Sequence, residues 1–446
     1  MERLIRTLAV GTLLVGTLVA PSPARGFTGF GASTADATFD RSMTFSIELA
    51  GGAPEQLEIL LQFADDDATF VAPVRATGGS ATFTWDAASD FVVPNTLVTY
   101  RWRAIVDGEP TESPAAQLLY DDDRDGLDWQ QREMGRATVH WYGSAEDAAV
   151  RFGELSADGA TQAEELLGTE LAGPIDIFVY DSREDFFGAL GPGAREWTGA
   201  AAYPNLRTVF MWLGGGPQDY LETAIVHEVT HVVFHDATAN PFHEPAQWLN
   251  EGLATWAENR NADGSRSTVE FEASGGGLLA FDAITQAFPI SDRGAALAYS
   301  QGTVMVDRII SEHGEGAIAD IATAYRDGAT DAEAIEAGTG VAADELYAAF
   351  YADFGADAPQ PIAPSALGDS DVPLPGGGLP SPEPGSSGGG VPVSERPDGA
   401  LAESGYDASL LFYGLGVMAL VVAGGVLFIV ARGARRPPEP PRAPRT

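Results

Sequence analysis

The segment ETAIVHEVTHVVFHD, residues 222–236, holds three of the chain's six histidines on one apolar stretch. Residues four apart on an α-helix share a face, so His227 and His231 can direct imidazole nitrogens at one metal ion. Glu228 lies about 100° further round, where its carboxylate can accept a proton from a water molecule that the ion activates. His231 and His235 are also four apart, but a valine follows the first of them and offers no base. The spacing therefore predicts two ligands, His227 and His231, and a general base, Glu228.

A third protein ligand is expected on a second helix. The alternative interpretation, an apolar helix with histidines that only pack in a core, leaves two imidazoles and a carboxylate buried without a common partner, which is costly. The chain contains no cysteine, so a metal must be held by histidine and carboxylate. Glu251 lies in QWLNEGLATWAE, residues 247–258, and nineteen residues separate it from His231. The intervening DATANPFHEPA is rich in turn-forming residues, which would reverse the chain and let the two helices pack.

These two motifs together resemble those of the gluzincin metallopeptidases, thermolysin-like and M1-like enzymes in which HExxH is followed by a glutamate in a WLNEGxA run. They also resemble those of the peptidase MA-like family of exported bacterial proteins. The resemblance covers about residues 120–355. It implies an α+β zincin-like fold and one catalytic Zn²⁺ held by His227, His231 and Glu251. Glu228 would be the general base in hydrolysis of a peptide bond.

The resemblance extends to three further residues. Asn250 and Glu258 match positions that flank the glutamate ligand, and Glu258 is expected to accept a hydrogen bond from a ligand histidine. A solvated helix carboxylate is the alternative for Glu258. The segment LAYSQGTVMVDRII, residues 297–310, is similar to the family's Tyr-x-x-Gly run. Tyr299 would thus donate its phenol to the oxyanion, unless it is only structural.

The segment before the first helix bears on the substrate. Zincins hold the substrate backbone against an edge strand there, and WTGAAAYPNLRTVFMWL, residues 197–213, occupies that place. Thr208–Trp212 alternate as such an edge would. M1 aminopeptidases carry Gly-x-Met-Glu-Asn in this segment to grip a free amine, whereas TGAAAYPN has no carboxylate. We therefore expect an endopeptidase. A zinc hydrolase of a non-peptide substrate and an inactive surface adhesion or interaction protein are the alternatives.

The rest of the chain predicts two folded domains. Residues 27–118 alternate apolar and polar side chains in short runs between Gly, Pro, Asp and Asn, which indicates an Ig/FnIII-like β-sandwich. Residues 119–356 carry strand patterns at 136–142, 174–182 and 206–213, and helical periodicity from 218 to about 354. This order is typical of a sheet subdomain followed by a helical one.

An acidic segment, DDDRDGLDW, lies at the junction between the predicted domains. Asp121, Asp123 and Asp125 fit the first half of a calcium loop, but Arg132 stands where the loop's last ligand, a glutamate, is needed. The sequence is compatible both with a Ca²⁺-binding loop and with a solvated acidic turn at this segment.

The two ends of the chain predict export and anchoring. Residues 1–26 have an arginine-containing start, an apolar stretch and the small-residue site Ser-Pro-Ala, as in a secretory signal peptide; an uncleaved anchor is the alternative. Residues 357–408 are a Pro/Gly/Ser-rich linker. Residues 409–431 carry no charge and are long enough for a transmembrane helix, and the Arg-rich tail 432–446 would then be cytoplasmic. A sortase-type signal has a similar layout, but LPSPEPG lacks the Thr-Gly that it needs.

The amino-acid composition limits the classes of molecule that the chain can bind. The chain has 446 residues, 64 of them acidic and 25 basic, and a net charge of -39. Binding of nucleic acid needs clustered basic residues, so nucleic acid is excluded as a partner. We expect a peptide or protein substrate and a membrane contact through the C-terminal helix. Nothing in the sequence indicates the oligomeric state.

Overall fold

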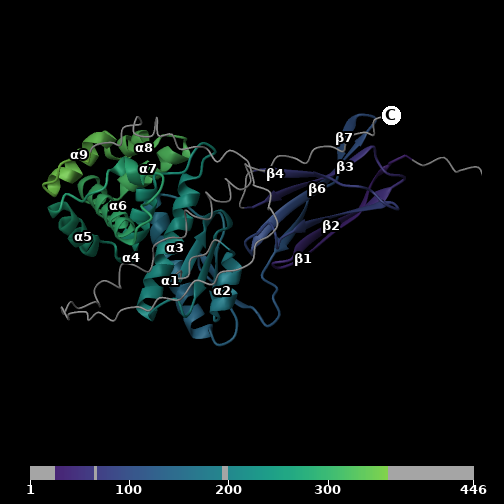
Figure 1. Cartoon of the computed structure of the whole chain (residues 1–446), viewed down its shortest axis with the longest axis horizontal. Coiled ribbons are helices and arrows are strands. Elements are labelled where there is room, and N and C mark those ends of the chain that lie inside the picture. Colours follow the sequence, from purple (N-terminus) through teal and green to yellow (C-terminus); the bar gives the residue numbers. More distant parts are fainter. Residues whose placement is uncertain (1–25, 65–67, 193–198, 360–446) are drawn as a thin grey trace, which may run out of the picture. The chain divides into compact units, whose positions relative to one another are not determined.

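A computed structural model describes residues 26–64, 68–192 and 199–359. The predicted signal peptide up to residue 25, the linker from residue 360, the membrane span and the arginine-rich tail lie outside these residues. Within the described part of the chain, no helix is long and apolar enough to cross a membrane. The chain forms two compact units, which divide between Arg124 and Asp125 (Figure 1).

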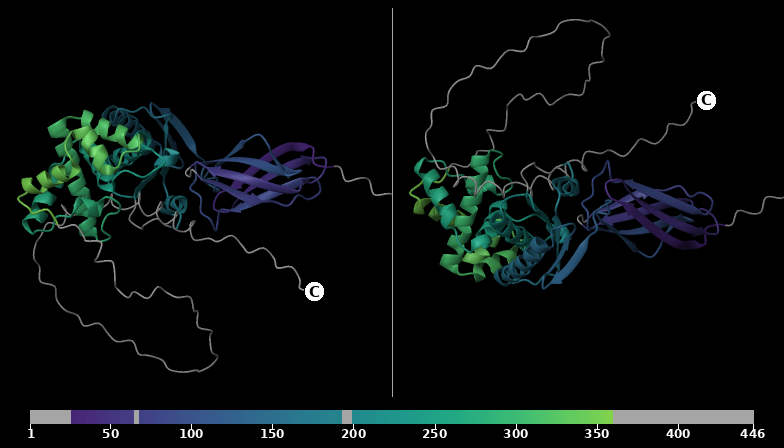
Figure 2. Two further views of the ribbon diagram at one scale, coloured as in Figure 1. Left: turned by 90° about the horizontal axis from the view of Figure 1, so that it is seen from above. Right: turned by 90° about the horizontal axis from the view of Figure 1, so that it is seen from below.

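The first unit consists of antiparallel strands in two sheets, which confirms a β-rich N-terminal domain. One sheet contains β1 (Gly29–Thr38), β2 (Ser42–Ala50) and β5 (Ser80–Asp86); the other contains β3 (Gln56–Phe63), β4 (Thr69–Pro73), β6 (Thr96–Val106), β7 (Glu109–Glu112) and β8 (Ala116–Tyr120). Alternate side chains of both sheets enter one core, as the period of two requires. The rings of Phe45 on β2 and Tyr100 on β6 meet across it, 4.9 Å apart. The sheets therefore pack as a sandwich, seen in Figures 1 and 2 as purple and blue strands.

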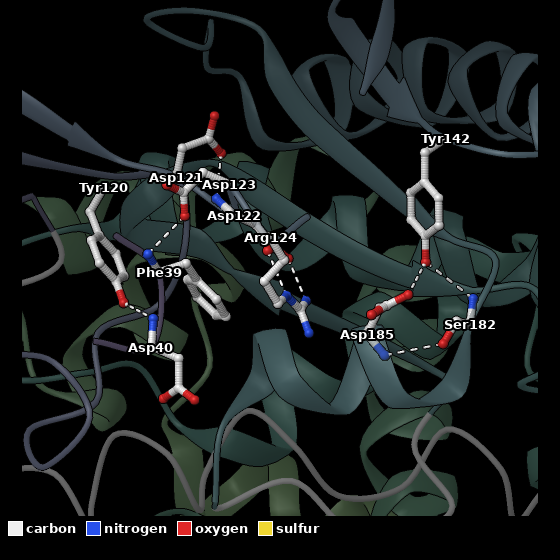
Figure 3. Close-up of polar contacts among 10 residues, drawn as sticks. All are labelled: Phe39, Asp40, Tyr120, Asp121, Asp122, Asp123, Arg124, Tyr142, Ser182 and Asp185. Carbon is white, nitrogen blue, oxygen red and sulfur yellow. Dashed lines mark hydrogen bonds and ion pairs between the residues drawn. The ribbon is translucent and has the colours of Figure 1, made fainter. Parts of the chain in front are cut away.

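The acidic segment after β8 makes contacts within this unit (Figure 3). The Asp123 carboxylate accepts a hydrogen bond from the Phe39 N–H at 2.8 Å. Asp122 is buried and forms an ion pair with Arg124, whose Nε lies 2.7 Å from Oδ1. Asp121 accepts from the N–H of Asp122 at 2.8 Å. These aspartates all have protein partners, and calcium binding at this segment stays a prediction.

The second unit is built on one mixed sheet, with described strands in the order β12–β13–β11–β10–β9. The strands are β9 (Gln130–Met134), β10 (Ala137–Trp141), β11 (Ile175–Tyr180), β12 (Ala200–Tyr203) and β13 (Thr208–Trp212). The three inner strands run parallel, and β9 and β12 pair antiparallel at the two edges. A parallel pair needs a long crossover, and α1 (Glu146–Leu167) supplies the one between β10 and β11. The helix α2 (Arg183–Leu190) follows β11; its N-cap Ser182 and Asp185 share a hydrogen-bonded group with Tyr142 (Figure 3).

The expectation that Thr208–Trp212 form the edge strand is wrong. These residues are β13, which pairs with β11 on one side and with β12 on the other. Four of its five side chains are buried because both faces of the strand are covered. The edge beside the helices is β12, which lies within the expected segment 197–213 but before the residues chosen from it.

Helices follow from Gln218 to Asp353, as predicted. They are α3 (Gln218–Thr238), α4 (Gln247–Asn259), α5 (Asp263–Ser274), α6 (Asp292–His313), α7 (Gly316–Arg326), α8 (Asp331–Thr339) and α9 (Ala343–Asp353), with short 3₁₀ helices η1 (Pro204–Leu206) and η2 (Phe281–Ile284). α3 contacts β12, α1, α4 and α7, which explains why it is apolar on nearly all sides. Figures 1 and 2 show these helices in teal to yellow-green.

α4 and α6 approach each other through two glycines. A β-carbon at Gly252 would lie 2.4 Å from the carbonyl carbon of Gly302, and one at Gly302 would lie 2.4 Å from the carbonyl oxygen of Trp248. Neither position can carry a side chain without moving a backbone. Gly252 follows Glu251 directly, and Gly302 is three residues beyond Tyr299, so this contact determines how near those two side chains come.

Candidate metal centre

α3 and α4 bring His227, His231 and Glu251 together. The carboxylate atom Oε2 of Glu251 lies 3.5 Å from Nε2 of His227 and 3.4 Å from Nε2 of His231. All three side chains are buried, with at most 2% of each residue exposed. Among the described residues, this is the one group of three His, Asp or Glu side chains whose ligand atoms lie within 4.8 Å of one another. It has the composition of a catalytic zinc site with three protein ligands.

Two observations test whether the group fits a zinc ion. Two ligand atoms, each about 2.1 Å from a tetrahedral ion, are about 3.4 Å apart, which matches the two measured separations. Nε2 of His231 and Oε2 of Glu251 are buried, and neither has a hydrogen-bond partner among the described residues. Such atoms are costly to bury unless a common partner satisfies them, and a cation does so. The residues present fit zinc.

The second nitrogen of each imidazole is held by α4. Nδ1 of His227 donates to Oε1 of Glu258 at 2.9 Å, and Nδ1 of His231 donates to Oδ1 of Asn250 at 2.8 Å. With the proton on Nδ1, each Nε2 presents a lone pair toward Glu251. Glu258 lies seven residues beyond Glu251, or about two helical turns, so both carboxylates face α3. Carboxylates and amides placed in this way orient ligand imidazoles and raise their basicity.

Glu228 is buried beside the three ligand side chains, and its Oε2 has no hydrogen-bond partner within the described part of the chain. Burial raises the pKa of this carboxyl; the neighbouring His227 and His231 side chains counteract part of the effect, and the N–H of Ala202 on β12 adds a smaller opposing contribution. A buried carboxylate with one free oxygen and a raised pKa is suited to accept a proton and give it back. Strand β12, at the edge of the sheet, therefore contacts Glu228, the residue predicted to be the general base.

Tyr299 reaches the same place from α6. Its ring centroid lies 6.4 Å from that of His227, and its hydroxyl faces Glu251. Burial first, and then the charge of Glu251, raise the pKa of Tyr299 well above its usual value. The phenol therefore keeps its proton and can donate a hydrogen bond. The structure brings together every residue that the sequence proposed for the site, from three helices.

Comparison with known proteins gives a match over this part of the chain. Residues 156–352 match the family model of the Peptidase MA superfamily. The match supports a gluzincin-type zinc peptidase. It contains both helical motifs and Tyr299, and it leaves out the first unit. No curated protein sequence matches the chain.

Solved structures give distant likenesses. Yeast LTA4 hydrolase is 11% identical, with 72% of this chain and 62% of that one covered and a TM-score of 0.33. An aminopeptidase N family protein from Idiomarina loihiensis is 7% identical, with 67% and 71% covered and a TM-score of 0.36. An M1 zinc metallopeptidase from Deinococcus radiodurans is 12% identical, with 70% and 87% covered and a TM-score of 0.26.

The other histidines lie outside the ligand group. His235 is in the last turn of α3, and His313 ends α6. His140 on β10 binds the Asp176 carboxylate at 2.8 Å and stacks on Phe178.

Two site features were missed by the sequence reasoning. One is the N–H of Ala202, because a backbone group has no signature in an alanine-rich run. The other is Tyr220, on the first turn of α3. Burial raises its pKa well above the usual value, and the charges of Glu228 and Glu258 raise it further. Tyr220 precedes Glu228 by eight residues, about two turns along one helix face, which is a signal that could have been used.

Proposed function

We propose that the chain is a membrane-anchored, extracellular zinc metallopeptidase that cleaves peptides internally. The observation that carries this proposal is the meeting of His227, His231 and Glu251, whose ligand atoms lie within 4.8 Å of one another. Among the described residues, Nε2 of His231 and Oε2 of Glu251 are buried there without a hydrogen-bond partner. A zinc ion bound there would lower the pKa of a water molecule and polarise the substrate carbonyl. The Peptidase MA match supports the same chemistry.

The chain's own residues would divide the remaining work. Glu228 takes a proton from the attacking water and passes it to the nitrogen of the leaving amine. Tyr299, protonated because burial and Glu251 raise its pKa, donates a hydrogen bond to the oxygen on which negative charge develops. Glu258 and Asn250 hold the two imidazoles in the tautomer that leaves Nε2 free.

The edge strand β12 supports an extended peptide substrate. The N–H of Trp212 donates to the Gly199 carbonyl at 2.9 Å, so alternate residues from Gly199 onward face β13. Ala200 and Ala202, between them, direct backbone groups away from the sheet. The N–H of Ala202 meets Glu228, so the carbonyl of Ala202 and the backbone groups of Ala200 are the ones with which a peptide would pair. A peptide can add to such an edge through main-chain hydrogen bonds. These bonds do not depend on how far the bound segment is from the ends of the peptide. The absence of a carboxylate in TGAAAYPN favours internal cleavage over removal of an N-terminal residue.

The location rests on sequence alone. The signal-like N-terminus, the uncharged residues 409–431 and the arginines after them support a protein held by one C-terminal span with its folded units outside the cell. Proteolysis of intact cells that express a tagged chain tests this orientation. An extracellular protease should remove the folded units and leave the C-terminal tag protected. Protection of the whole chain would contradict it.

The activity is tested on a fragment of residues 27–356, with Glu228→Gln as the matched control. We expect both proteins to hold about one zinc ion, because glutamine leaves the three ligands intact. Only the wild type should cleave a broad peptide library, and loss of the general base should reduce kcat by about 100-fold or more. A wild type that holds zinc yet cleaves no more than the Gln variant would overturn the peptidase assignment. Zinc-dependent hydrolysis of other esters or amides would then point to the non-peptide hydrolase.

A further inference from the structure

The loop between η2 and α6 brings apolar side chains to the candidate centre. The ring of Phe288 meets that of Tyr299 edge-on, with centroids 5.0 Å apart at 85°. The Tyr299 ring in turn lies 6.4 Å from that of the ligand His227. Phe288 is only partly buried. Phe288 is therefore linked to the candidate zinc ligand His227 through the ring of Tyr299, and part of its own ring is exposed to solvent.

Ile290, two residues further on, extends this apolar surface. It is 92% exposed, the highest value among the large exposed hydrophobic residues of the described chain. Single exposed apolar residues are common, but this one lies two residues from a partly buried phenylalanine that packs on the proposed catalytic tyrosine. From residue 283 to residue 291 the loop contains no ionisable side chain, in a chain of net charge -39. This loop is therefore uncharged in a chain that is acidic as a whole.

The loop is held firmly at both ends. At its start, the Thr285 carbonyl accepts a hydrogen bond from the N–H of Gln247 on α4 at 2.7 Å. At its end, Ser291 caps α6, and Arg293 forms two hydrogen bonds of 2.8 and 2.7 Å with Glu272 on α5. A surface anchored in this way is formed before a ligand arrives, which reduces the ordering cost of binding.

We propose that Phe288 and Ile290 form a specificity wall, which receives a large apolar side chain of the substrate next to the scissile bond. This inference rests on the proposed peptidase function. An extended peptide advances about 3.4 Å per residue, so side chains one or two positions from a carbonyl beside Tyr299 come within reach of Phe288. Charged side chains at that position would lose solvation against the wall without gaining a partner.

The test uses paired peptides that carry Leu or Phe in one member and Ser in the other, at each position flanking the cleaved bond. The wild type should prefer the apolar member by about tenfold or more in kcat/KM at one position. Phe288→Ala should reduce that preference about tenfold, because kcat/KM should fall much more for the apolar peptide than for the Ser peptide. Phe242→Ala, a control at a 74% exposed phenylalanine between α3 and α4, should keep the full preference.

Two results would overturn the wall. One is a wild type without preference between the paired peptides. The other is a Phe288→Ala variant that loses both peptides equally, which would assign Phe288 to the support of Tyr299 alone. Binding of the same peptides to Glu228→Gln, measured by calorimetry, separates this inference from the activity. If nothing is cleaved but the apolar peptide binds more tightly and Phe288→Ala removes the difference, the wall stands and the peptidase proposal fails. Equal binding of both peptides rejects the wall.

Discussion

Glu258 contacts the ligand group of the candidate centre through His227. Its Oε1 lies 2.9 Å from Nδ1 of that histidine, and it does not belong to the ligand group. An imidazole whose second nitrogen donates to a carboxylate is fixed in one orientation and binds metal more strongly. The contribution of Glu258 should therefore appear in zinc affinity and leave the ligand count unchanged.

We predict that Glu258→Ala lowers zinc affinity by about 10- to 100-fold, as measured by competition with a chromogenic chelator. Glu258→Gln should restore most of the affinity, since its amide oxygen can still accept the Nδ1 hydrogen. Glu270→Ala on α5, an exposed carboxylate, serves as the control and should bind zinc like the wild type. Equal affinity in Glu258→Ala and wild type would show that the hydrogen bond does not orient His227.

At the residue scale, helical geometry made the ligands predictable. The separations of His227 from His231 and of Glu251 from Glu258 are close to one and two helical turns, so each pair shares a face whatever the fold around it. The N–H of Ala202 and the ring of Phe288 could not be predicted in the same way. Both reach the site through tertiary contacts, across a sheet edge and between a loop and a helix, and their own residue types carry no chemical signature.

At the element scale, the contact between α4 and α6 places Tyr299 opposite Glu251. We predict that Gly302→Ala pushes the helices apart, destabilises the second unit by about 1–3 kcal/mol and lowers kcat at least tenfold, while zinc is retained. Urea unfolding, zinc content and steady-state kinetics measure the three effects. Gly264→Ala on α5, where a β-carbon meets nothing within 4 Å, should leave kcat unchanged. A Gly302→Ala variant with wild-type kcat would show that this contact does not position Tyr299.

The elements themselves were only partly predictable. The strands near 136–142, 174–182 and 206–213 and the helices after 218 follow from periodicity, because each has a long apolar pattern of one kind. β12 was missed, since four residues of Ala-Ala-Ala-Tyr show no alternation. The edge position was consequently given to β13. Strand order depends on which strands pair, and pairing is decided by tertiary contacts that a single sequence does not display.

At the scale of the whole molecule, the two units have separate cores, and the candidate centre belongs to the second alone. Zinc should therefore stabilise only one of them. Without a bound cation, the lone pairs of His231 and Glu251 are buried at a cost. Free zinc at about one hundred times its dissociation constant stabilises the unit that binds it by about 2.7 kcal/mol.

We predict that calorimetry of the protein resolves two unfolding transitions and that a zinc chelator lowers the Tm of one of them. Tryptophan-to-Phe replacement at Trp102 or Trp248, one in each core, lets fluorescence assign the transitions. Glu251→Gln should respond much less to the chelator, because it lacks one of the three ligands. Equal shifts of both transitions would mean that the units unfold together, and no shift would mean that zinc does not bind at His227, His231 and Glu251. The separation matters for function because the first unit does not contain the metal centre. We therefore expect it to stay folded when zinc is scarce, even where the second unit loses stability.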